Sequence, residues 1–128
     1  MILKICVVAL VCLLLVSCSV GGNRFFFSKK DHAQVCSVKK NRIFRIELPA
    51  NLTTGFNWNV ESLDEEFFKV VSSGYIASRP MMPGSGGISW WEIEPLKIGR
   101  SQIKMRYYRK WEGPEKSADK FFLQLIIK

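Results

Sequence analysis

Two side chains that could perform nucleophilic chemistry lie near residue 35. His32 is the only histidine in the sequence, and Cys36 follows it four residues later. A cysteine nucleophile needs its general base within hydrogen-bond reach. On an extended segment an even spacing places two side chains on one face but well apart. We therefore expect no catalytic pair here, and we do not expect the protein to be an enzyme.

The sequence also lacks the usual patterns of metal and phosphate sites. One histidine and one free cysteine cannot assemble the usual zinc site. The run Gly84-Ser85-Gly86-Gly87 is rich in glycine, but it lacks the lysine and the following helix of a phosphate-binding loop. The sequence therefore predicts neither a bound metal nor a cofactor.

The first residues have the pattern of an export signal. Lys4 supplies one positive charge, and residues 5–16 form an unbroken apolar run that is too short for a membrane anchor. The run ends in Leu15-Val16-Ser17-Cys18, which resembles the lipobox of bacterial lipoproteins. We expect residues 1–17 to be a lipoprotein signal peptide and Cys18 to be lipidated, so that the protein is held on the bacterial cell envelope. The alternative is an ordinary secretory signal and a soluble secreted protein.

The expected domain organisation follows from this leader. Residues 18–33 are predicted to form a tether and linker, and residues 34–128 a single folded domain. Cys36 would then be the only cysteine in the folded part, so no internal disulfide could form and stability would rest on the hydrophobic core. Within its strand-like segment we expect Cys36 to be a buried, inert thiol.

The elements that must position any site are short strands. Apolar and polar residues alternate with a period of two, and no segment after the leader keeps a helical period. Gly, Pro and Asn separate the segments. This pattern predicts an all-β protein, an immunoglobulin-like antiparallel β-sandwich of about seven or eight strands. One expected strand contains Cys36, and the others cover residues 43–48, 56–61, 67–71, 88–93, 103–107 and 121–127.

The tryptophans and the net charge give further expectations. Trp58 alternates with Phe56 and Val60, so we expect Trp58 in the core rather than at the interface. Trp91 is expected to share the core face with Ile93, which leaves Trp90 outside. The chain carries a formal net charge of +8, but its cations are scattered, which favours a solvated surface over nucleic-acid binding. We expect a monomer without a nucleic-acid partner.

Three segments between the strands have more distinctive sequences than simple turns require. They are Leu48-Pro49-Ala50-Asn51-Leu52-Thr53-Thr54-Gly55-Phe56-Asn57-Trp58, then Gly84-Ser85-Gly86-Gly87, then Arg106-Tyr107-Tyr108-Arg109-Lys110-Trp111-Glu112-Gly113-Pro114. In order and spacing they resemble the three signature loops of the chagasin-type inhibitors of papain-like cysteine peptidases. The resemblance covers essentially all of residues 34–128.

This resemblance implies a function and a set of site residues. The protein would be a reversible, competitive inhibitor, and a papain-like cysteine peptidase would be its partner. The first loop would enter the active-site cleft, while the second and third loops would lie against its two sides. The residues that the resemblance assigns to peptidase binding are Asn51, Leu52, Thr53, Thr54, Gly55, Phe56, Gly84, Ser85, Gly86, Gly87, Arg109, Lys110 and Trp111.

The sequence departs from the family pattern at two positions. Leu52 and Lys110 stand where the family has proline. Because proline fixes its own φ, we expect both loops to be less pre-organised and inhibition to be weaker. The main alternative function is an immunoglobulin-like adhesin or a structural binding module of the cell envelope.

Overall fold

The computed structural model describes residues 24–78 and 84–128 of the 128-residue chain. The expected signal peptide, the lipidation site at Cys18 and residues 18–23 of the expected tether lie outside the described residues. Residues 79–83, which precede the second loop motif, also lie outside them. No helix in the described part is long and apolar enough to cross a membrane.

The described chain consists of eight strands and three single-turn 3-10 helices. The strands are β1 (Phe26–Ser28), β2 (Val35–Val38), β3 (Phe44–Ala50), β4 (Phe56–Leu63), β5 (Phe68–Ala77), β6 (Gly87–Pro95), β7 (Gly99–Arg109) and β8 (Asp119–Ile127). The helices are η3 (Lys29–Asp31), η4 (Leu52–Thr54) and η5 (Pro114–Lys116). The predicted all-β class is therefore confirmed.

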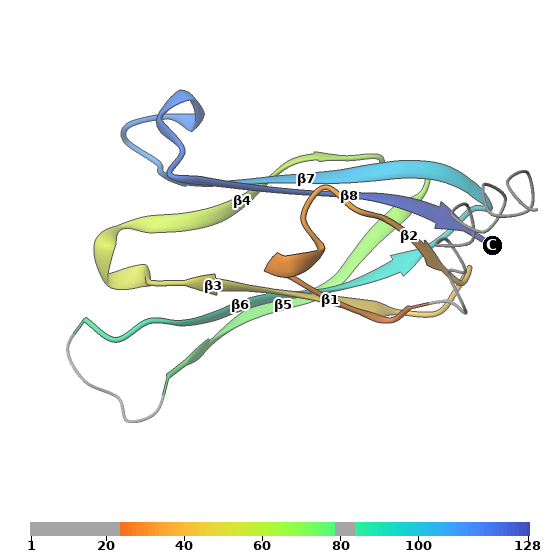
Figure 1. Ribbon diagram of the computed structural model, residues 1–128, viewed down its shortest axis with the longest axis horizontal. Helices are drawn as coiled ribbons and strands as arrows, with labels where there is room; N and C mark the ends of the chain where they lie inside the picture. The colour runs from red at the N-terminus through yellow and green to blue at the C-terminus, as the bar shows by residue number, and fades with distance from the viewer. Residues whose placement is uncertain (1–23, 79–83) are drawn as a thin grey trace, which may run out of the picture.

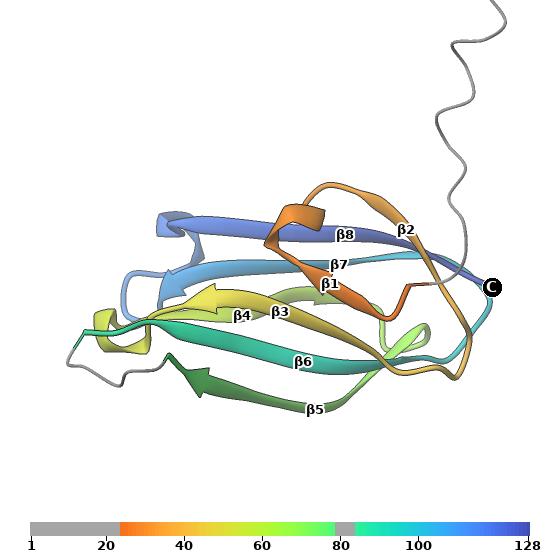
Figure 2. The same ribbon diagram turned by 60° about the horizontal axis from the view of Figure 1, so that its bottom comes forward.

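The strands form two four-stranded sheets that pack face to face (Figure 1). The first sheet has the order β1-β3-β6-β5, which is seen across its face in Figure 2, and the second has the order β2-β8-β7-β4. The central pairs are antiparallel as predicted. The two edge pairs, β1 with β3 and β2 with β8, are parallel instead. This arrangement is possible because neither pair is joined by a hairpin: β2 of the opposite sheet lies between β1 and β3 along the chain, and five strands lie between β2 and β8.

Alternating side chains from both sheets fill the space between them. Phe44, Ile46 and Leu48 of β3 are at most 1% exposed, and they face the equally buried Ile103 and Leu123 of the opposite sheet. The period-two pattern of the sequence is thus the pattern of the core. Burying such side chains contributes about 1.5–3 kcal/mol each relative to exposure.

The tryptophans lie as the alternation predicts. Trp58 is 7% exposed, and its indole nitrogen donates to the Pro49 carbonyl at 2.9 Å. Trp91 packs against the core, and Trp90 lies on the outer face, where the Arg45 guanidinium covers its ring at 4.2 Å. Val60, two residues after Trp58, is 39% exposed. It lies on the edge strand β4, directly before an irregularity in the pairing with β7.

The predicted linker boundary is also wrong. Residues 24–33 belong to the folded domain, because β1 pairs with β3 and places the fully buried Phe27 in the core. Arg24 then forms a 2.8 Å salt bridge with Asp31, whose carboxylate also accepts from the Ser28 amide. A three-residue strand is too short to show an alternating pattern, which is why the sequence did not reveal it.

Candidate functional site

The three loop segments meet at one pole of the sandwich. The first connects β3 to β4, the second connects β5 to β6, and the third connects β7 to β8. In Figure 1 all three connections lie at the left end, while the C-terminus lies at the right end. All three loops therefore belong to the same end of the sandwich. Strand direction explains the arrangement, because β3, β5 and β7 all end at this pole.

The first loop is ordered by its own hydrogen bonds. Residues 52–54 form the 3-10 turn η4, and Asn51 caps it: the Asn51 Oδ1 atom accepts from the Thr53 amide at 3.2 Å and from the Thr53 hydroxyl at 2.6 Å. The Thr54 hydroxyl donates to the Asn51 carbonyl at 2.7 Å. These bonds restrain the turn in the absence of the family proline at Leu52, whose side chain is 40% exposed.

Asn51 also joins the first loop to the core and to the second loop. Its backbone amide donates to the Tyr107 hydroxyl at 2.8 Å, and its side-chain amide donates to the Gly84 carbonyl at 3.0 Å. The Tyr107 ring lies between Phe56 and Trp58, with centroid distances of 5.3 and 5.0 Å. Asn51 is therefore a positioning residue within this arrangement, since both ends of its amide group are already bonded.

Arg109 joins the third loop to the first. Its Nε atom donates to the Thr54 carbonyl at 2.9 Å, and its guanidinium lies 4.4 Å from the centre of the Phe56 ring. A 3.2 Å salt bridge to Glu112 holds the guanidinium from the other side. Arg109, which the resemblance assigns to peptidase binding, thus also bonds within the protein.

Trp111 covers Gly55 and exposes most of its ring. The side chain is 72% exposed, the largest value among the large apolar residues of the described chain. Gly55 has a φ of +82°, and a Cβ atom there would lie 2.3 Å from the Trp111 ring. Only glycine meets both conditions without strain. The pair therefore places a broad aromatic surface beside the tip of the first loop.

The second loop approaches the first through its glycines. A Cβ atom on Gly86 would lie 3.3 Å from the Ala50 carbonyl, and one on Gly87 would lie 2.3 Å from the Ile76 carbonyl. Gly87 pairs with Ala50 on one side and with Ala77 on the other, and a Cβ atom on it would also lie 2.5 Å from the Tyr75 hydroxyl, so this position has no room for a side chain. Gly84 and Ser85 continue this loop toward residues 79–83.

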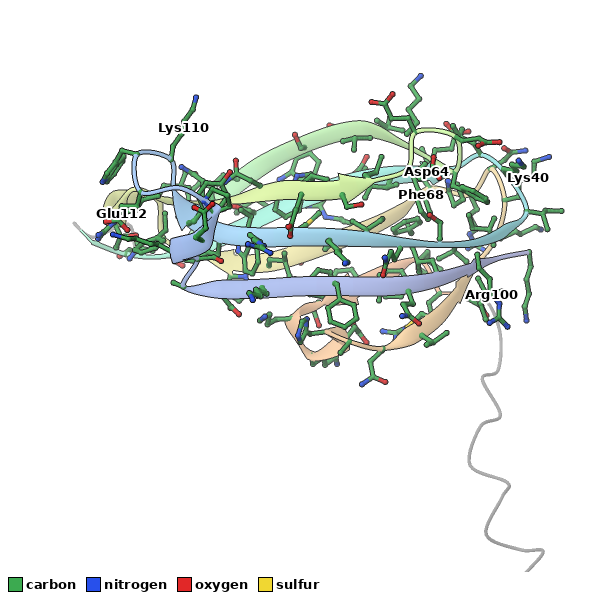
Figure 3. All side chains as sticks on the ribbon, turned by 90° about the horizontal axis from the view of Figure 1, so that it is seen from above. Lys40, Asp64, Phe68, Arg100, Lys110 and Glu112 are labelled. Atoms are coloured by element: carbon green, nitrogen blue, oxygen red, sulfur yellow. The ribbon has the colours of Figure 1, made fainter. Side chains whose placement is uncertain are left out.

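Lys110 contrasts with its neighbour Arg109. Its side chain is exposed and points away from the sandwich at the loop end (Figure 3). No hydrogen bond or salt bridge joins it to the rest of the described chain. The replacement of the family proline by Lys110 therefore adds a free positive charge to this pole without adding a contact to the loop itself.

His32 and Cys36 are engaged separately. The His32 Nδ1 atom accepts from the Phe122 amide at 3.1 Å, and Cys36 is a buried free thiol that contacts Arg24. Burial raises the pKa of the Cys36 thiol, although the Arg24 guanidinium opposes this effect. Within residues 24–78 and 84–128, no group of three His, Cys, Asp or Glu side chains could hold a metal ion.

Tyr107 is the residue of this pole that sequence reasoning missed. Alternation predicts it as a core residue of a strand, and it does pack against the core. Its hydroxyl, however, reaches the end of the strand and bonds to Asn51. A tyrosine two residues before the end of a strand is the signal that could have indicated this role, because its polar tip must find a partner outside the core.

Comparison with known proteins identifies the family. The model described as chagasin family peptidase inhibitor I42 matches residues 37–125. This chain belongs to the chagasin family. Amoebiasin-2 from Entamoeba histolytica is 30% identical to it over 103 residues, which cover 78% of this chain and 81% of amoebiasin-2. Chagasin from Trypanosoma cruzi is 27% identical over 103 residues, which cover 77% of this chain and 93% of chagasin.

The fold of this chagasin-family protein also agrees with a solved structure. The crystal structure of the cysteine protease inhibitor EhICP2 from Entamoeba histolytica matches with a TM-score of 0.70 and 24% identity. The match covers 80% of this chain and 93% of that structure. The immunoglobulin-like sandwich that the strand pattern predicts is thus the fold of a chagasin-like inhibitor.

Proposed function

We propose that this protein is a reversible, competitive inhibitor of papain-like cysteine peptidases. The observation that carries this proposal is the direct bonding of the three loops at one pole. Asn51 joins the first loop to the second, and Arg109 joins the third to the first. Together with membership of a peptidase inhibitor family, this pre-formed edge supports a role in occupying a peptidase cleft.

In this proposal the first loop is the part that enters the cleft. Thr53, Thr54 and Gly55 are small enough to descend between walls that exclude longer side chains. The carbonyls of Asn51, Leu52 and Thr54 already accept hydrogen bonds within the inhibitor, so the turn keeps its shape. A peptide bond held in this tight turn does not present its carbonyl to the nucleophile in an attack geometry. Inhibition would therefore require no chemistry.

Trp111 and the glycine loop would hold the two sides of the cleft. Trp111 offers a rigid aromatic surface with few rotatable bonds, and tryptophan is enriched at interface hot spots. On the other side, Gly84, Ser85 and Gly86 bring backbone rather than bulky side chains to the contact. The exposed Lys110 would favour peptidases with an acidic rim.

The alternative function, an adhesin or a structural envelope module, receives no support. The family match and the relatives are peptidase inhibitors. An adhesin would also have no need for a capped Thr-Thr-Gly turn held against an exposed tryptophan. Inhibition therefore remains the one function that both the loops and the relatives favour.

Titration of papain with the full chain tests the proposal. The apparent inhibition constant should rise linearly with substrate concentration, as competition requires. Thr54→Arg should abolish inhibition without unfolding the protein, because a long charged side chain cannot follow the loop into the cleft. Ser62→Arg, at an exposed position near the far end of β4, is the matched control and should inhibit like wild type. Absence of inhibition by the wild type at micromolar concentration would overturn the proposal.

We further propose that the protein is exported, acylated at Cys18 and monomeric. The lipobox-like Leu15-Val16-Ser17-Cys18 supports the first two points. The segment 18–23 would act as the tether, since the folded part already includes residue 24. Metabolic labelling with a fatty acid, compared between wild type and Cys18→Ala, tests the acylation. Sedimentation of the detergent-solubilised protein tests the oligomeric state.

A further inference from the structure

The pole opposite the three loops has an unusual surface composition. There the β2–β3 loop, the β6–β7 turn and the C-terminal residue lie together. The Lys40 amide donates to the Lys128 carbonyl at 2.8 Å, and the Asn41 amide donates to the Pro95 carbonyl at 2.8 Å. Figure 3 shows Lys40 at this end and Lys110 at the other. The two poles are separated by the length of the eleven-residue strand β7, or about 35 Å.

Unpaired positive charge gathers at this pole. Lys39, Lys40, Arg42 and Lys128 are all exposed, and none of them forms a salt bridge with any residue of the described chain. The nearest acidic segment is the turn at residues 64–66 between β4 and β5. Its Glu66 is already engaged by Lys97 at 2.5 Å. Asp64 and Glu65 of the same turn are exposed carboxylates without a salt bridge to any described residue, so the positive excess is centred on the β2–β3 loop, where Lys39, Lys40 and Arg42 follow one another without an acidic residue.

Exposed apolar side chains lie among these cations. Phe25 is 56% exposed and stacks under the Arg42 guanidinium at 4.7 Å, and Ile98 at the tip of the β6–β7 turn is 64% exposed. A nucleic-acid partner would account for the cations but not for the exposed apolar side chains among them. The mixture of cations with protruding apolar groups matches a bilayer surface, where apolar groups enter the interface and lysines keep their ammonium groups among the lipid headgroups.

The course of the chain favours the same partner. Arg24, the first described residue, lies at this pole because its amide donates to the Ser37 carbonyl at 2.9 Å, close to the end of β2. The apolar run 5–16 lies a short distance before it in the sequence. The segment between them, from Cys18 to Asn23, can span at most about 20 Å. Whatever holds the N-terminal segment to a membrane would therefore also hold this pole near the surface.

We propose that Lys39, Lys40, Arg42, Lys128, Phe25 and Ile98 form a docking surface for a bilayer containing anionic phospholipids. Docking here directs the three loops away from the membrane. The inference goes beyond peptidase inhibition and does not depend on it. It would fix the orientation of the domain, which a flexible tether by itself does not do.

Lysine acetylation of the full chain on vesicles tests this docking. Vesicles of phosphatidylcholine alone are compared with vesicles that also contain phosphatidylglycerol, and the extent of acetylation at each lysine is read by mass spectrometry. On the anionic vesicles Lys39, Lys40 and Lys128 should react several-fold more slowly. Lys104 and Lys116, on the flank and at the loop pole, should react equally on both. The slower reaction should be reversed by high salt, because surface electrostatics are screened.

Two matched triple variants separate this site from general charge effects. Each basic residue near an anionic surface changes the ratio of docked to undocked protein by about fivefold, so the loss of three cations in K39E/K40E/R42E should by itself lower it by on the order of 100-fold. The three added carboxylates should lower it further, and Lys128 should become exposed. K30E/K104E/K120E makes the same change of charge on the flanks and should retain the protection. Thermal unfolding of both variants checks that they are folded. Papain inhibition, read separately, should stay unchanged in both.

Three outcomes would overturn the proposal. The first is equal protection on the two kinds of vesicle, and the second is protection of Lys128 that survives K39E/K40E/R42E. The third is equal protection by soluble duplex DNA, which would indicate a general polyanion surface. Ile98→Ser helps to distinguish a bilayer from a soluble polyanion, because loss of this exposed apolar side chain should weaken protection by vesicles. Failure of papain inhibition would contradict the proposed function and leave these readouts intact.

Discussion

The Nε atom of Arg109 donates a hydrogen bond to the carbonyl oxygen of Thr54 at 2.9 Å. This single contact joins two loops that are 55 residues apart in sequence. The same guanidinium covers the Phe56 ring and pairs with Glu112. Arg109 therefore shapes the edge from within, and its effect on a peptidase is exerted through the position of the first loop.

Arg109→Ala should weaken papain inhibition by about tenfold, because a charge-assisted hydrogen bond contributes roughly 1.5–3 kcal/mol and part of it is exposed here. Arg109→Lys should give an intermediate loss, since an ammonium cannot bond to Thr54 and stack on Phe56 with the same geometry. Lys110→Ala removes a neighbouring charge that has no internal contact and is the control. If the Arg109 and Lys110 variants lost inhibition to the same extent, the positive charge of Arg109, rather than its hydrogen bond to Thr54, would account for its effect. Inhibition constants and thermal unfolding are measured for each.

Leu52→Pro should lower the inhibition constant by about two- to fivefold, since fixing φ removes roughly 0.4–1 kcal/mol of unfolded-loop freedom. The backbone accepts this change: Leu52 is the first residue of a 3-10 turn, and Asn51 before it is extended at φ −130° and ψ 97°. Leu52→Ala, which trims the side chain without fixing φ, is the control. A higher inhibition constant for the proline variant would mean that the loop changes conformation in the complex.

Gly55→Ala should disturb the three-loop pole in two ways, through backbone strain at residue 55 and through a clash with the Trp111 ring. A residue other than glycine at φ +82° costs about 1–2 kcal/mol, and the new methyl group would displace the Trp111 ring. Trp111→Ala alone should weaken inhibition by about 30-fold, as for a hot-spot tryptophan. The double variant should lose less than the sum of the two losses, with a coupling of about 1 kcal/mol or more. Additive losses would show that the two residues act independently.

Asp31 should make the protein less stable in acid. Burial by itself disfavours the carboxylate, but the hydrogen bonds from Arg24 and from the Ser28 amide outweigh this effect and lower the pKa of Asp31 below its ordinary value. A lowered folded-state pKa stabilises the protein above the unfolded-state value, and this stabilisation is lost as the pH falls through the folded-state pKa. The free energy of unfolding should therefore fall with pH below about 4.

The control for this effect is Asp31→Asn. At neutral pH the variant should be less stable than wild type by about 1 kcal/mol, because it loses the ion pair. The difference between the two proteins should shrink as the pH falls below about 4, where the wild-type carboxylate becomes protonated. Denaturant unfolding at a series of pH values measures both curves. A difference that does not depend on pH would contradict the assignment.

Most of the fold could be predicted because the core residues of the sandwich follow the alternation of apolar and polar residues along each strand. Phe44, Ile46 and Leu48 point inward at every second position, and the strand around them was placed correctly. The second half of β5 was not predicted, since Ser72-Ser73-Gly74 is typical of a turn. There the pairing with β6 decides the conformation, and Gly74 leaves room for the Trp90 ring, which a Cβ atom would approach to 2.8 Å.

The site was predictable as a set of loops but not as a set of contacts. The loop motifs identify the segments, and the strand order brings them to one pole. Which partner Arg109 or Tyr107 chooses depends on distances between segments more than fifty residues apart, and local sequence does not contain that information. The prediction that the first loop is less pre-organised at Leu52 did not take the Asn51 cap into account. Its hydrogen bonds form only when the turn is in place.

Phe27 has a consequence for how the domain would be released if the protein is anchored through Cys18 as proposed. Its side chain is fully enclosed between the sheets, although it lies only a few residues after the proposed tether at residues 18–23. A proteolytic cut ahead of residue 24 would shed an intact domain. A cut between β1 and β2 would instead leave the body of the sandwich without a phenylalanine of its core, a loss that costs about 3–5 kcal/mol in other proteins. The position of the cut therefore decides between shedding and inactivation.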